Sequence, residues 1–400
     1  MSSATPSDAL TFWFVAGETS GDARAAEVMR ALRAAMPGVR FAGAGGPRME
    51  PLADGPFDNW TSEAAVLGLW DVLRNYGYFR KKFEAMLRAI SVERPEAVVL
   101  VDYPGFNLRL AKALRSAGYP GKILYYISPQ VWAWNRGRIP KMARILDLMI
   151  CVFPFEAPMY EASGLHTVFV GHPLLEALEA ERIADPREPG LVGLFPGSRE
   201  REVKRIFPVM AAAAEILRAS RPGLRFEAAA ATEALAGRMR AMAPGIAVRT
   251  GTAHELMQRA EVGMVCSGTA TLEAAFFGLP YCLVYKIAWL TFEIGRRLVD
   301  VDALGIVNIL NNYRQNPPTD RRLPAQSAPH VVREFIQHQA TPEALAAEIQ
   351  RLLDGVAERA GLSRQLLEIA SELEADGASD RAARALLEHV ARPASEAPQT

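Results

Sequence analysis

Short runs of apolar residues alternate along the chain with longer segments whose apolar positions recur at helical spacing. This alternation is typical of a parallel sheet covered by helices. In the first half, the apolar runs predict strands near 11–16, 39–43, 97–101, 122–127, 148–152 and 167–170. In the second half they predict strands near 191–195, 225–230, 246–250, 262–266 and 281–285. Helical spacing predicts helices between them, for instance at 22–36, 106–117, 201–219, 253–259 and 269–277.

The strand rhythm is lost near 171–190, so the pattern predicts an α/β protein with two doubly wound domains in tandem. Such a pair leaves a cleft between the carboxyl ends of the two sets of strands, where ligands normally bind. The predicted parts are a first domain at 1–172, a second domain at 173–361 with a long polar loop at 311–330, C-terminal helices at 362–391 and a disordered tail at 392–400.

The charge balance limits the classes of partner. The chain has 400 residues, with 45 Lys and Arg against 45 Asp and Glu, so its formal net charge is zero. A broad attraction to nucleic acid is therefore not a property of the whole protein, and we expect no nucleic-acid partner. Three cysteines without metal-like spacing indicate buried, reduced residues. The start of the chain has no signal-peptide pattern, so the sequence predicts a cytoplasmic protein. The motifs contain no metal cluster, so no metal site is expected.

A strand, a turn and a helix follow one another in "LFPGSREREVKRIFPVM" (194–210). Gly197 and Ser198 turn the chain, Arg199 stands at the turn, and Glu202 falls in the first helical turn. Backbone N–H groups at a helix start, together with a fixed guanidinium, make a site for a diphosphate. The same residues also suit a simple helix cap, with Ser198 at the N-cap and Glu202 as its partner.

The stretch "VCSGTATLEAAFFGLP" (265–280) repeats this arrangement. Ser267, Gly268 and Thr269 offer hydroxyl and N–H groups after a buried strand, and Glu273 lies about one helical turn further on. A carboxylate there suits the two hydroxyls of a ribose, whereas the alternative is an ordinary turn with a surface glutamate. Two such turns in one domain, both at carboxyl ends of strands, favour a nucleotide site.

In the first half, "VAGETSGD" (15–22) has the position of a phosphate-binding turn between a strand and a helix. It carries Glu18 and Asp22 but no Lys or Arg, so its charge is wrong for a nucleotide. The nucleotide is therefore expected at the two turns of the second half and not here, although Ser20 and Gly21 offer hydrogen-bond donors. Glu18 and Asp22 would accept bonds from hydroxyls, brace neighbouring loops or cap the following helix.

Asp102 follows a Val/Leu strand in "VLVDYPGFNLRLAK" (99–112). A carboxylate at a strand end, with its back to an apolar sheet, has a raised pKa and suits a general base, although helix capping is the common alternative. Trp132, in "YYISPQVWAWNRGR" (125–138), either stacks on a ligand or fills a groove. A lone histidine such as His172 is more often structural than catalytic, and no second residue is spaced to make a metal site with it.

Two stretches interleave aromatic rings with cations: "NYGYFRKKFEAML" (75–87) and "YKIAWLTFEIGRRLV" (285–299). Such stretches suit the boundary between membrane and water, with the rings inserted and the cations at headgroup level. They equally suit amphipathic core helices with a solvated basic face. Both interpretations stay open for each stretch.

Taken together, the motifs resemble those of the lipid-A-disaccharide synthases, glycosyltransferases of the GT-B class (glycosyltransferase family 19) with two Rossmann-like domains. The resemblance runs from about residue 11 to about residue 350. It rests on motifs that occur in the family's order: "VAGETSGD", "GAGGPRM", "VDYPGFN", "SPQVWAW", "FPFE", "VGHP", "PGSREREV", "SGTATLE", "VYK", "NIL" and "REFIQ". Each motif alone is weak, whereas the ordered set is highly specific.

The resemblance implies transfer of a sugar from UDP-2,3-diacylglucosamine to 2,3-diacylglucosamine 1-phosphate (lipid X), in the lipid A and lipopolysaccharide biosynthesis of Gram-negative bacteria. The implied product is the β-1,6 disaccharide 1-phosphate, with UDP released and no metal or cofactor required. It further implies peripheral association with the inner-leaflet surface of the inner membrane. A homodimer is one implied arrangement, in which the C-terminal helices pack back on their own chain or exchange between subunits.

The resemblance also implies roles for residues at matching motif positions. Asp102 is the implied catalytic base, with Glu18 as the alternative, and Arg199 is the implied catalytic partner of the departing diphosphate. The UDP-sugar site is implied at Gly197, Ser198, Arg199, Glu202, Ser267, Gly268, Thr269, Thr271, Glu273, Asn308 and Gln337. The acceptor side is expected at Ser20, Gly21, Asp22 and Trp132.

Three departures from the family pattern accompany these matches. Gly105 stands where family members often carry a second Asp, the loop at 311–330 looks like an insertion, and 332–334 replaces the usual Pro-Glu pair. Two other functions stay open as alternatives. One is another UDP-sugar enzyme of the same fold, either a non-hydrolysing UDP-N-acetylglucosamine epimerase or a transferase with a different acceptor. The other is a non-catalytic UDP-sugar-binding protein at the membrane surface.

Overall fold

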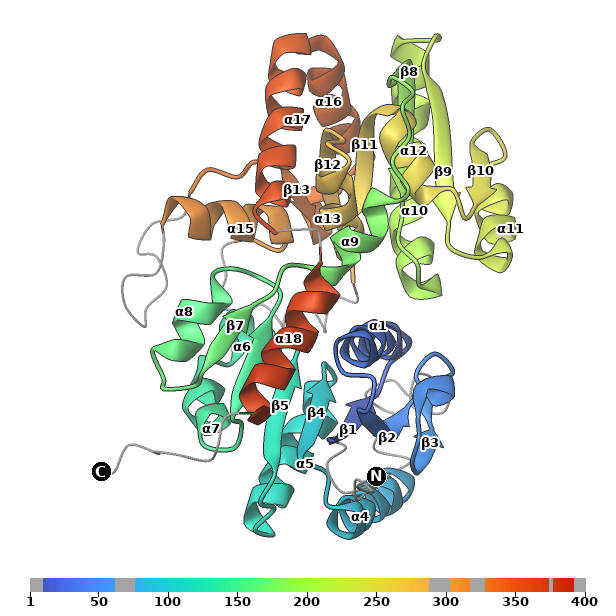
Figure 1. Cartoon of the computed structure of the whole chain (residues 1–400). Helices are drawn as coiled ribbons and strands as arrows, with labels where there is room; N and C mark the ends of the chain where they lie inside the picture. Colours follow the sequence, from blue (N-terminus) through green and yellow to red (C-terminus); the bar gives the residue numbers. More distant parts are fainter. Residues whose placement is uncertain (1–9, 62–75, 288–302, 317–327, 374–376, 392–400) are drawn as a thin grey trace. The chain divides into compact units, whose positions relative to one another are not determined.

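The computed structural model describes residues 10–61, 76–287, 303–316, 328–373 and 377–391. Within this part of the chain there are two compact α/β units, each built on one parallel sheet (Figure 1). The first unit takes the described residues of 10–132, 136–173 and 377–391, and the second takes those of 133–135 and 174–373. The predicted pair of doubly wound α/β domains is therefore confirmed.

The first sheet has seven strands in the order β3-β2-β1-β4-β5-β6-β7. Its strands are β1 (Thr11–Ala16), β2 (Arg40–Gly45), β3 (Phe57–Asn59), β4 (Ala97–Val101), β5 (Lys122–Tyr126), β6 (Leu148–Cys151) and β7 (Thr167–Phe169). The helices that accompany it are α1 (Thr19–Ala35), α4 (Tyr76–Glu93), α5 (Pro104–Ser116), α6 (Val131–Trp134), α7 (Ile139–Ala143), α8 (Glu156–Glu161) and α18 (Ala378–Ala391), with the 3₁₀ helices η1 (Glu50–Leu52) and η2 (Arg136–Arg138).

The second sheet has six strands in the order β10-β9-β8-β11-β12-β13. Its strands are β8 (Glu188–Phe195), β9 (Arg225–Ala230), β10 (Ala247–Thr250), β11 (Ala260–Cys266), β12 (Tyr281–Tyr285) and β13 (Glu334–Ile336). The helices of this half are α9 (Pro173–Glu179), α10 (Glu200–Ser220), α11 (Glu233–Met242), α12 (Ala253–Arg259), α13 (Thr269–Phe276), α15 (Ile306–Gln315), α16 (Pro342–Asp354) and α17 (Val356–Ser371), with the 3₁₀ helix η3 (Gln337–Gln339).

The central strands of both sheets are buried, whereas edge strands such as β10 are partly exposed. The strand β4, of sequence AVVLV, is fully buried along its length, as a central parallel strand requires. Capping residues that the sequence supplies locally stabilise the N-termini of α11 and α16. Thr341 opens α16 by accepting a hydrogen bond from the N–H of Ala344 at 3.2 Å, and Pro342 follows as the first helical residue.

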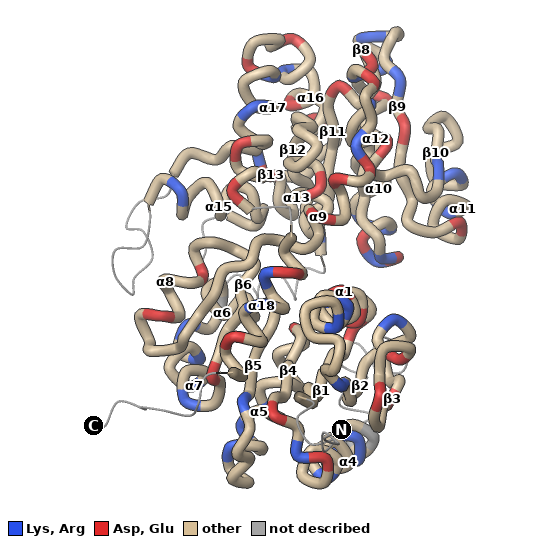
Figure 2. The backbone as a smooth tube through the Cα atoms, in the orientation of Figure 1, with Lys and Arg blue, Asp and Glu red and all other residues tan. Residues whose placement is uncertain are grey.

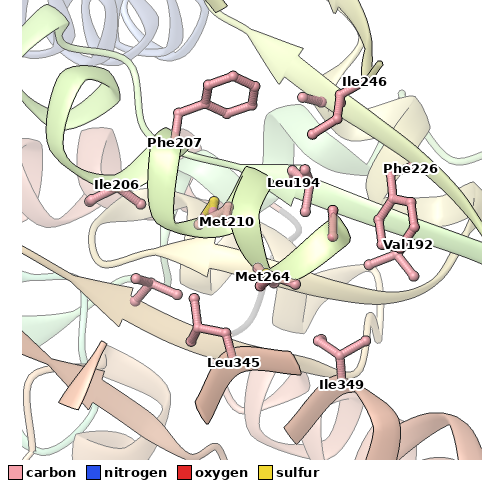
Figure 3. Close-up of a cluster of buried hydrophobic side chains, with 14 of the residues drawn as sticks. Val192, Leu194, Ile206, Phe207, Met210, Phe226, Ile246, Met264, Leu345 and Ile349 are labelled. Atoms are coloured by element: carbon pink, nitrogen blue, oxygen red, sulfur yellow. The ribbon is translucent and has the colours of Figure 1, made fainter. Parts of the chain in front are cut away.

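The core of the second unit joins the sheet to helices on its face (Figure 3). Leu194 and Met264 contribute from the sheet, Phe207 and Met210 from α10, and Leu345 from α16. All are at most 1% exposed, and a fully buried side chain of this size contributes about 1.5–3 kcal/mol to stability. This core fixes the position of the helix α10, which begins directly after the turn 196–199 that the sequence predicts to bind a diphosphate.

The C-terminal residues divide between the two units. The helix α17 packs against α13 in the second unit, whereas α18 packs against α1 in the first (Figure 1). Arg381 of α18 also donates from Nε to the carbonyl of Val170 at 2.9 Å. The expected segment 362–391 is thus two separate helices with different partners.

Charge is spread over both units without segregation by sign (Figure 2). All three cysteines are buried and carry no disulfide, as predicted. Among the helices of the described residues, none combines the length and the apolarity needed to cross a bilayer. The stretch 288–302, most of the predicted polar loop (317–327) and the predicted tail 392–400 lie outside the described residues.

Candidate functional site

The turn 17–18 and the turn 102–103 emerge side by side from the first sheet. They follow β1 and β4, which are neighbours and from which the chain proceeds to opposite sides of the sheet. This is the topological switch point, the edge at which doubly wound sheets bind ligands. The structure therefore brings Glu18 and Asp102 together, as their strand-end positions predict.

The backbone at Asp102 is held in an unusual conformation. Asp102 and the next residue, Tyr103, have φ angles of 47° and 50°, in the left-handed region that side chains other than glycine rarely adopt. The carbonyl of Asp102 accepts hydrogen bonds from Asn107 Nδ2 at 2.7 Å and from Tyr125 Oη at 2.6 Å. Its N–H donates to the carbonyl of Tyr126 at 2.9 Å. These bonds fix the direction in which the carboxylate leaves the chain.

The electrostatic environment of Asp102 favours the protonated form. Burial raises the pKa of the Asp102 carboxyl, and the negative charge of Glu18 raises it further. A carboxylate that takes up a proton more readily than usual suits general-base chemistry near neutral pH. Sequence reasoning predicted the burial, and the structure adds Glu18 as a second cause.

A glycine makes room for the turn at Asp102. A Cβ placed on Gly17 would lie 2.2 Å from the ring of Tyr103, which itself packs edge-on against Trp60 with centroids 6.1 Å apart. The Tyr103 ring also contacts Phe106, with centroids 6.3 Å apart. Trp60 and Phe106 thus contact the Tyr103 ring, and the absence of a side chain on Gly17 leaves room for the ring beside the turn 17–18.

We expect Gly17→Ala to lower the free energy of unfolding by about 1–3 kcal/mol, because the added methyl group overpacks the Tyr103 ring. Thermal unfolding followed by circular dichroism measures the loss. Gly38→Ala is the matched control, since a Cβ there meets nothing within 4 Å. Equal stabilities of the two variants would contradict this account of the turn.

Asp22 braces a loop and does not face the surface. It is 0% exposed, and its carboxylate accepts bonds from the N–H groups of Gly46, Arg48 and Met49 at 2.9, 3.0 and 3.1 Å. This corrects the expectation that Asp22 contacts the acceptor and supports the alternative of a loop brace. Ser20 is exposed at the start of α1, whereas Gly21 is buried beneath it.

Trp132 fills the core. It is 1% exposed, its Nε1 donates to Glu156 Oε1 at 2.9 Å, and its ring lies edge-on against Phe155 at 5.1 Å. This corrects the expectation that Trp132 stacks on a ligand, because both faces of the ring are covered by protein. Burial raises the pKa of its partner Glu156 to about 7.

His172 is a structural residue, as expected for a lone histidine. Burial lowers the pKa of His172 to about 3, so the ring stays neutral.

The second sheet has its own switch point, between the neighbouring strands β8 and β11. The turn 196–199 follows β8 and the turn 267–268 follows β11. Both turns predicted to bind a nucleotide therefore leave the same edge of the sheet. Burial raises the pKa of Cys266, and the charge of Glu202 raises it further, so the end of β11 lies within electrostatic reach of the first turn of α10.

The turn after β8 combines a helix cap with an exposed cation. Glu202 Oε2 accepts from the N–H groups of Ser198 and Arg199, both at 3.1 Å, and so closes the start of α10. Gly197 has φ 105°, and a Cβ on it would lie 2.5 Å from the Glu202 carboxylate. Arg199 touches Glu202 Oε1 at 3.1 Å, yet its side chain is 82% exposed. Glu202 thus has the capping role, and Arg199 is the group that can reach a ligand.

The turn after β11 exposes Gly268 and Thr269 to solvent, whereas Thr271 in the following helix is buried. Gly268, with φ 143°, and Thr269 are exposed, and Ser267 is half-buried. Thr271 is 0% exposed and donates from Oγ1 to the carbonyl of Gly268 at 2.7 Å. This corrects the expectation that Thr271 contacts the donor, because its hydroxyl holds the turn from inside.

His254 is a site residue that sequence reasoning missed. Its Nε2 lies 3.5 Å from Glu273 Oε2, and its Nδ1 lies 2.6 Å from Glu181 Oε2. The two carboxylates raise the pKa of His254 to about 9, so the ring is a cation at neutral pH. No spacing in the sequence links these three residues. The pairing fixes the carboxylate of Glu273, which is half-buried at the base of the turn.

The side chains of Asn308 and Gln337 both form hydrogen bonds with backbone groups. Asn308 is 3% exposed, and it bonds to the carbonyl and the N–H of Val332 at 2.8 and 3.0 Å and to Glu334 at 2.7 Å. This corrects the expectation of a donor contact for Asn308, since its amide is already saturated. Gln337, with φ 53°, pairs with the backbone of Ile287 at 3.4 and 3.3 Å.

Comparisons with known proteins agree with these motifs. A family model described as lipid-A-disaccharide synthetase matches residues 12–385. A lipid-A-disaccharide synthase of Geobacter metallireducens is 38% identical, with 94% of this chain and 97% of that protein covered. Among solved structures, a UDP-GlcNAc 2-epimerase from Neisseria meningitidis bound to UDP-GlcNAc has a TM-score of 0.57 at 9% identity, covering 95% and 99% of the two chains. The glycotransferase of kitacinnamycin has a TM-score of 0.56 at 15% identity, covering 96% and 99%. The two structures share the fold.

Proposed function

The chain belongs to the lipid-A-disaccharide synthetase family, and from that membership we propose how its residues carry out the family's reaction. It is a glycosyltransferase of lipid A disaccharide synthesis. The donor is UDP-2,3-diacylglucosamine and the acceptor is 2,3-diacylglucosamine 1-phosphate. The 6-hydroxyl oxygen of the acceptor bonds to the anomeric carbon of the donor, the bond from that carbon to the diphosphate oxygen breaks, and UDP leaves. The configuration at the anomeric carbon inverts, so no covalent sugar–enzyme intermediate forms.

Asp102 takes the proton from the acceptor hydroxyl in this proposal. The single observation that carries it is the carboxylate fixed at the first switch point, with its backbone clamped and its pKa raised by burial. A base is effective when its pKa approaches the working pH and its position is fixed. Glu18, beside it, is an exposed carboxylate without such a clamp among the described residues.

Glu18 tunes the base. Its charge raises the pKa of Asp102, so Glu18→Gln is expected to lower that pKa. Activity of a base is lost as the pH falls through its pKa, so the acid limb of the profile of kcat/KM against pH should move to lower pH. Measuring this profile for the wild type and the variant checks the direction. Abolished turnover in the variant would instead make Glu18 itself the base.

The donor binds at the second switch point in this proposal. Arg199 contacts the diphosphate, the exposed N–H and hydroxyl groups of Gly268 and Thr269 face a phosphate, and Glu273 accepts bonds from the ribose hydroxyls. Fixed donors aimed at a departing diphosphate stabilise charge as it develops. The exposure of Arg199 supports its part, because a cation that protein does not cover remains available to a ligand.

Contact with the inner-leaflet membrane surface is the remaining part of the proposal. Both substrates carry acyl chains and so partition into a bilayer. On α4, Lys82 bonds to Asp58 at 2.7 Å and Arg80 to Glu84 at 2.8 Å, while Phe83 packs partly against the core. These contacts favour the core-helix interpretation for part of 75–87, so the acyl chains are the main support for membrane contact.

Product analysis tests the function against its alternatives. The purified protein is incubated in detergent with UDP-2,3-diacylglucosamine and the acceptor, and separately with UDP-N-acetylglucosamine alone. Mass spectrometry should find the disaccharide 1-phosphate and UDP in the first reaction. NMR should find no epimerised sugar in the second. An epimerised product, or donor binding without turnover, would support one of the alternatives.

A further inference from the structure

The loop 46–49, between β2 and η1, is held in one position by a buried carboxylate. Its N–H groups at Gly46, Arg48 and Met49 all donate to Asp22, and Met49 is fully buried. A Cβ on Gly46 would lie 2.7 Å from the Asp22 carboxylate, so glycine is needed for this approach. The loop backbone is thus fixed to the start of α1, which also fixes the point where its two exposed residues, Pro47 and Arg48, leave the chain.

Arg48 is the one charged residue of this loop, and it is exposed. No carboxylate in the described part of the chain forms a salt bridge with it. On α1, by comparison, Arg24 pairs with Glu27 at 2.8 Å and Arg33 pairs with Asp54 at 2.5 Å. The exposed guanidinium of Arg48 is therefore available to a ligand, and its position decides which ligand it can reach.

Arg48 stands at the same sheet edge as Asp102. The strand β1 lies between β2 and β4, so their carboxyl ends are two strand spacings apart, or about 10 Å. Arg48 follows β2, Glu18 follows β1 and Asp102 follows β4. An arginine side chain and a carboxylate at this separation can face opposite sides of one sugar ring.

The turn 18–22 exposes the carboxylate of Glu18 and contains no cation, so a phosphate at this edge needs a cation from elsewhere. The acceptor of the proposed function carries its reacting hydroxyl and its phosphate on one ring. We propose that Arg48 binds this 1-phosphate and so orients the hydroxyl toward Asp102. Arginine suits a phosphate because its planar fork donates two parallel hydrogen bonds. The inference rests on the proposed function and extends it to the specificity of the acceptor.

The test compares two acceptors, 2,3-diacylglucosamine 1-phosphate and 2,3-diacylglucosamine without the phosphate. The wild type should use the phosphorylated acceptor with a kcat/KM about 10–100-fold higher, as charge-assisted bonds to the phosphate predict. In Arg48→Gln this preference should fall to about one, mainly through the KM for the acceptor, while UDP affinity is unchanged. Arg48→Lys should keep part of the preference.

Arg40→Gln is the matched control, since Arg40 is exposed at the opposite end of the same strand. It should keep the full preference for the phosphorylated acceptor. A preserved preference in Arg48→Gln overturns the inference and leaves the proposed function standing. Weakened UDP binding in that variant also overturns it, because the arginine would then act on the donor.

If the wild type converts neither acceptor, the proposed function fails, and calorimetry still tests the inference. Binding of the two acceptors in detergent is then measured for the wild type and for Arg48→Gln. A preference for the phosphate that disappears in the variant supports the site. Equal binding of both acceptors to both proteins overturns it.

Discussion

Replacing Asp102 by asparagine is expected to lower the turnover number for disaccharide formation by about 10²–10⁴-fold. Asparagine has nearly the same shape as aspartate, but its amide does not take up the proton of the attacking hydroxyl. It also tolerates the left-handed backbone at φ 47°, so the turn should stay intact. Single-turnover kinetics with both substrates measures the loss of the chemical step.

The choice of asparagine matters for the interpretation. Alanine has no side-chain amide to favour the left-handed region, so Asp102→Ala would combine loss of the base with strain in the backbone. The unfolding temperature of Asp102→Asn should match that of the wild type. Near-normal turnover in this variant would mean that the base is another group, with Glu18 the first alternative.

Replacing Arg199 by alanine is expected to weaken UDP binding by about 10–100-fold and to lower kcat/KM by about 10²–10³-fold. The guanidinium carries five N–H donors, and only its contact with Glu202 engages it among the described residues. The remaining donors are available to a diphosphate, whose charge grows as the sugar leaves. Isothermal titration calorimetry with UDP measures the first effect and steady-state kinetics the second.

The variant should fold normally, because an exposed ion pair contributes only about 0–1 kcal/mol to stability. Arg201→Ala is the matched control, since Arg201 is exposed in the first turn of the same helix. It should bind UDP almost as the wild type does. If both variants lost affinity equally, general positive charge rather than the position of Arg199 would account for the binding.

Hydrophobic pattern was sufficient for the long strands and failed for two short ones. The buried runs of β1 and β4 are apolar at every position or nearly so, which leaves few other ways to place them. The strands β3 (FDN) and β13 (EFI) have three residues each and are only partly buried. The strand β7 is equally short but was predicted, because its residues belong to the apolar run VFV, whereas FDN and EFI each contain an acidic residue. Short strands of mixed polarity give no periodicity to detect, and they form through pairing with neighbouring strands.

Strand-end position predicted which turns form the site, but burial decided which side chains face outward. Asp22, Thr271 and Asn308 stand in motifs and look available in the sequence, yet each is at most 3% exposed and bonded to backbone. A polar residue that stabilises a turn from inside can be of the same type as one that binds a ligand, so the sequence does not distinguish the two. Only the packing of the turn separates the two roles.

Contacts between residues far apart in the sequence could not be predicted. His254 meets Glu181 across 73 residues, and α18 returns to pack against α1 near the other end of the chain. No local signal in the sequence records either contact. The left-handed backbone at Asp102 and Tyr103 was also unforeseen, because neither residue type requires it and the hydrogen bonds that accompany it come from Asn107 and Tyr125.

The central claim is a division of roles, with the base at the first switch point and the nucleotide at the second. Calorimetric UDP affinity, measured side by side for Asp102→Asn and Arg199→Ala, tests it most directly. We expect Asp102→Asn to bind UDP within about twofold of the wild type, and Arg199→Ala to bind it about 10–100-fold more weakly. Loss of UDP affinity in Asp102→Asn, or full affinity in Arg199→Ala, would contradict the claim.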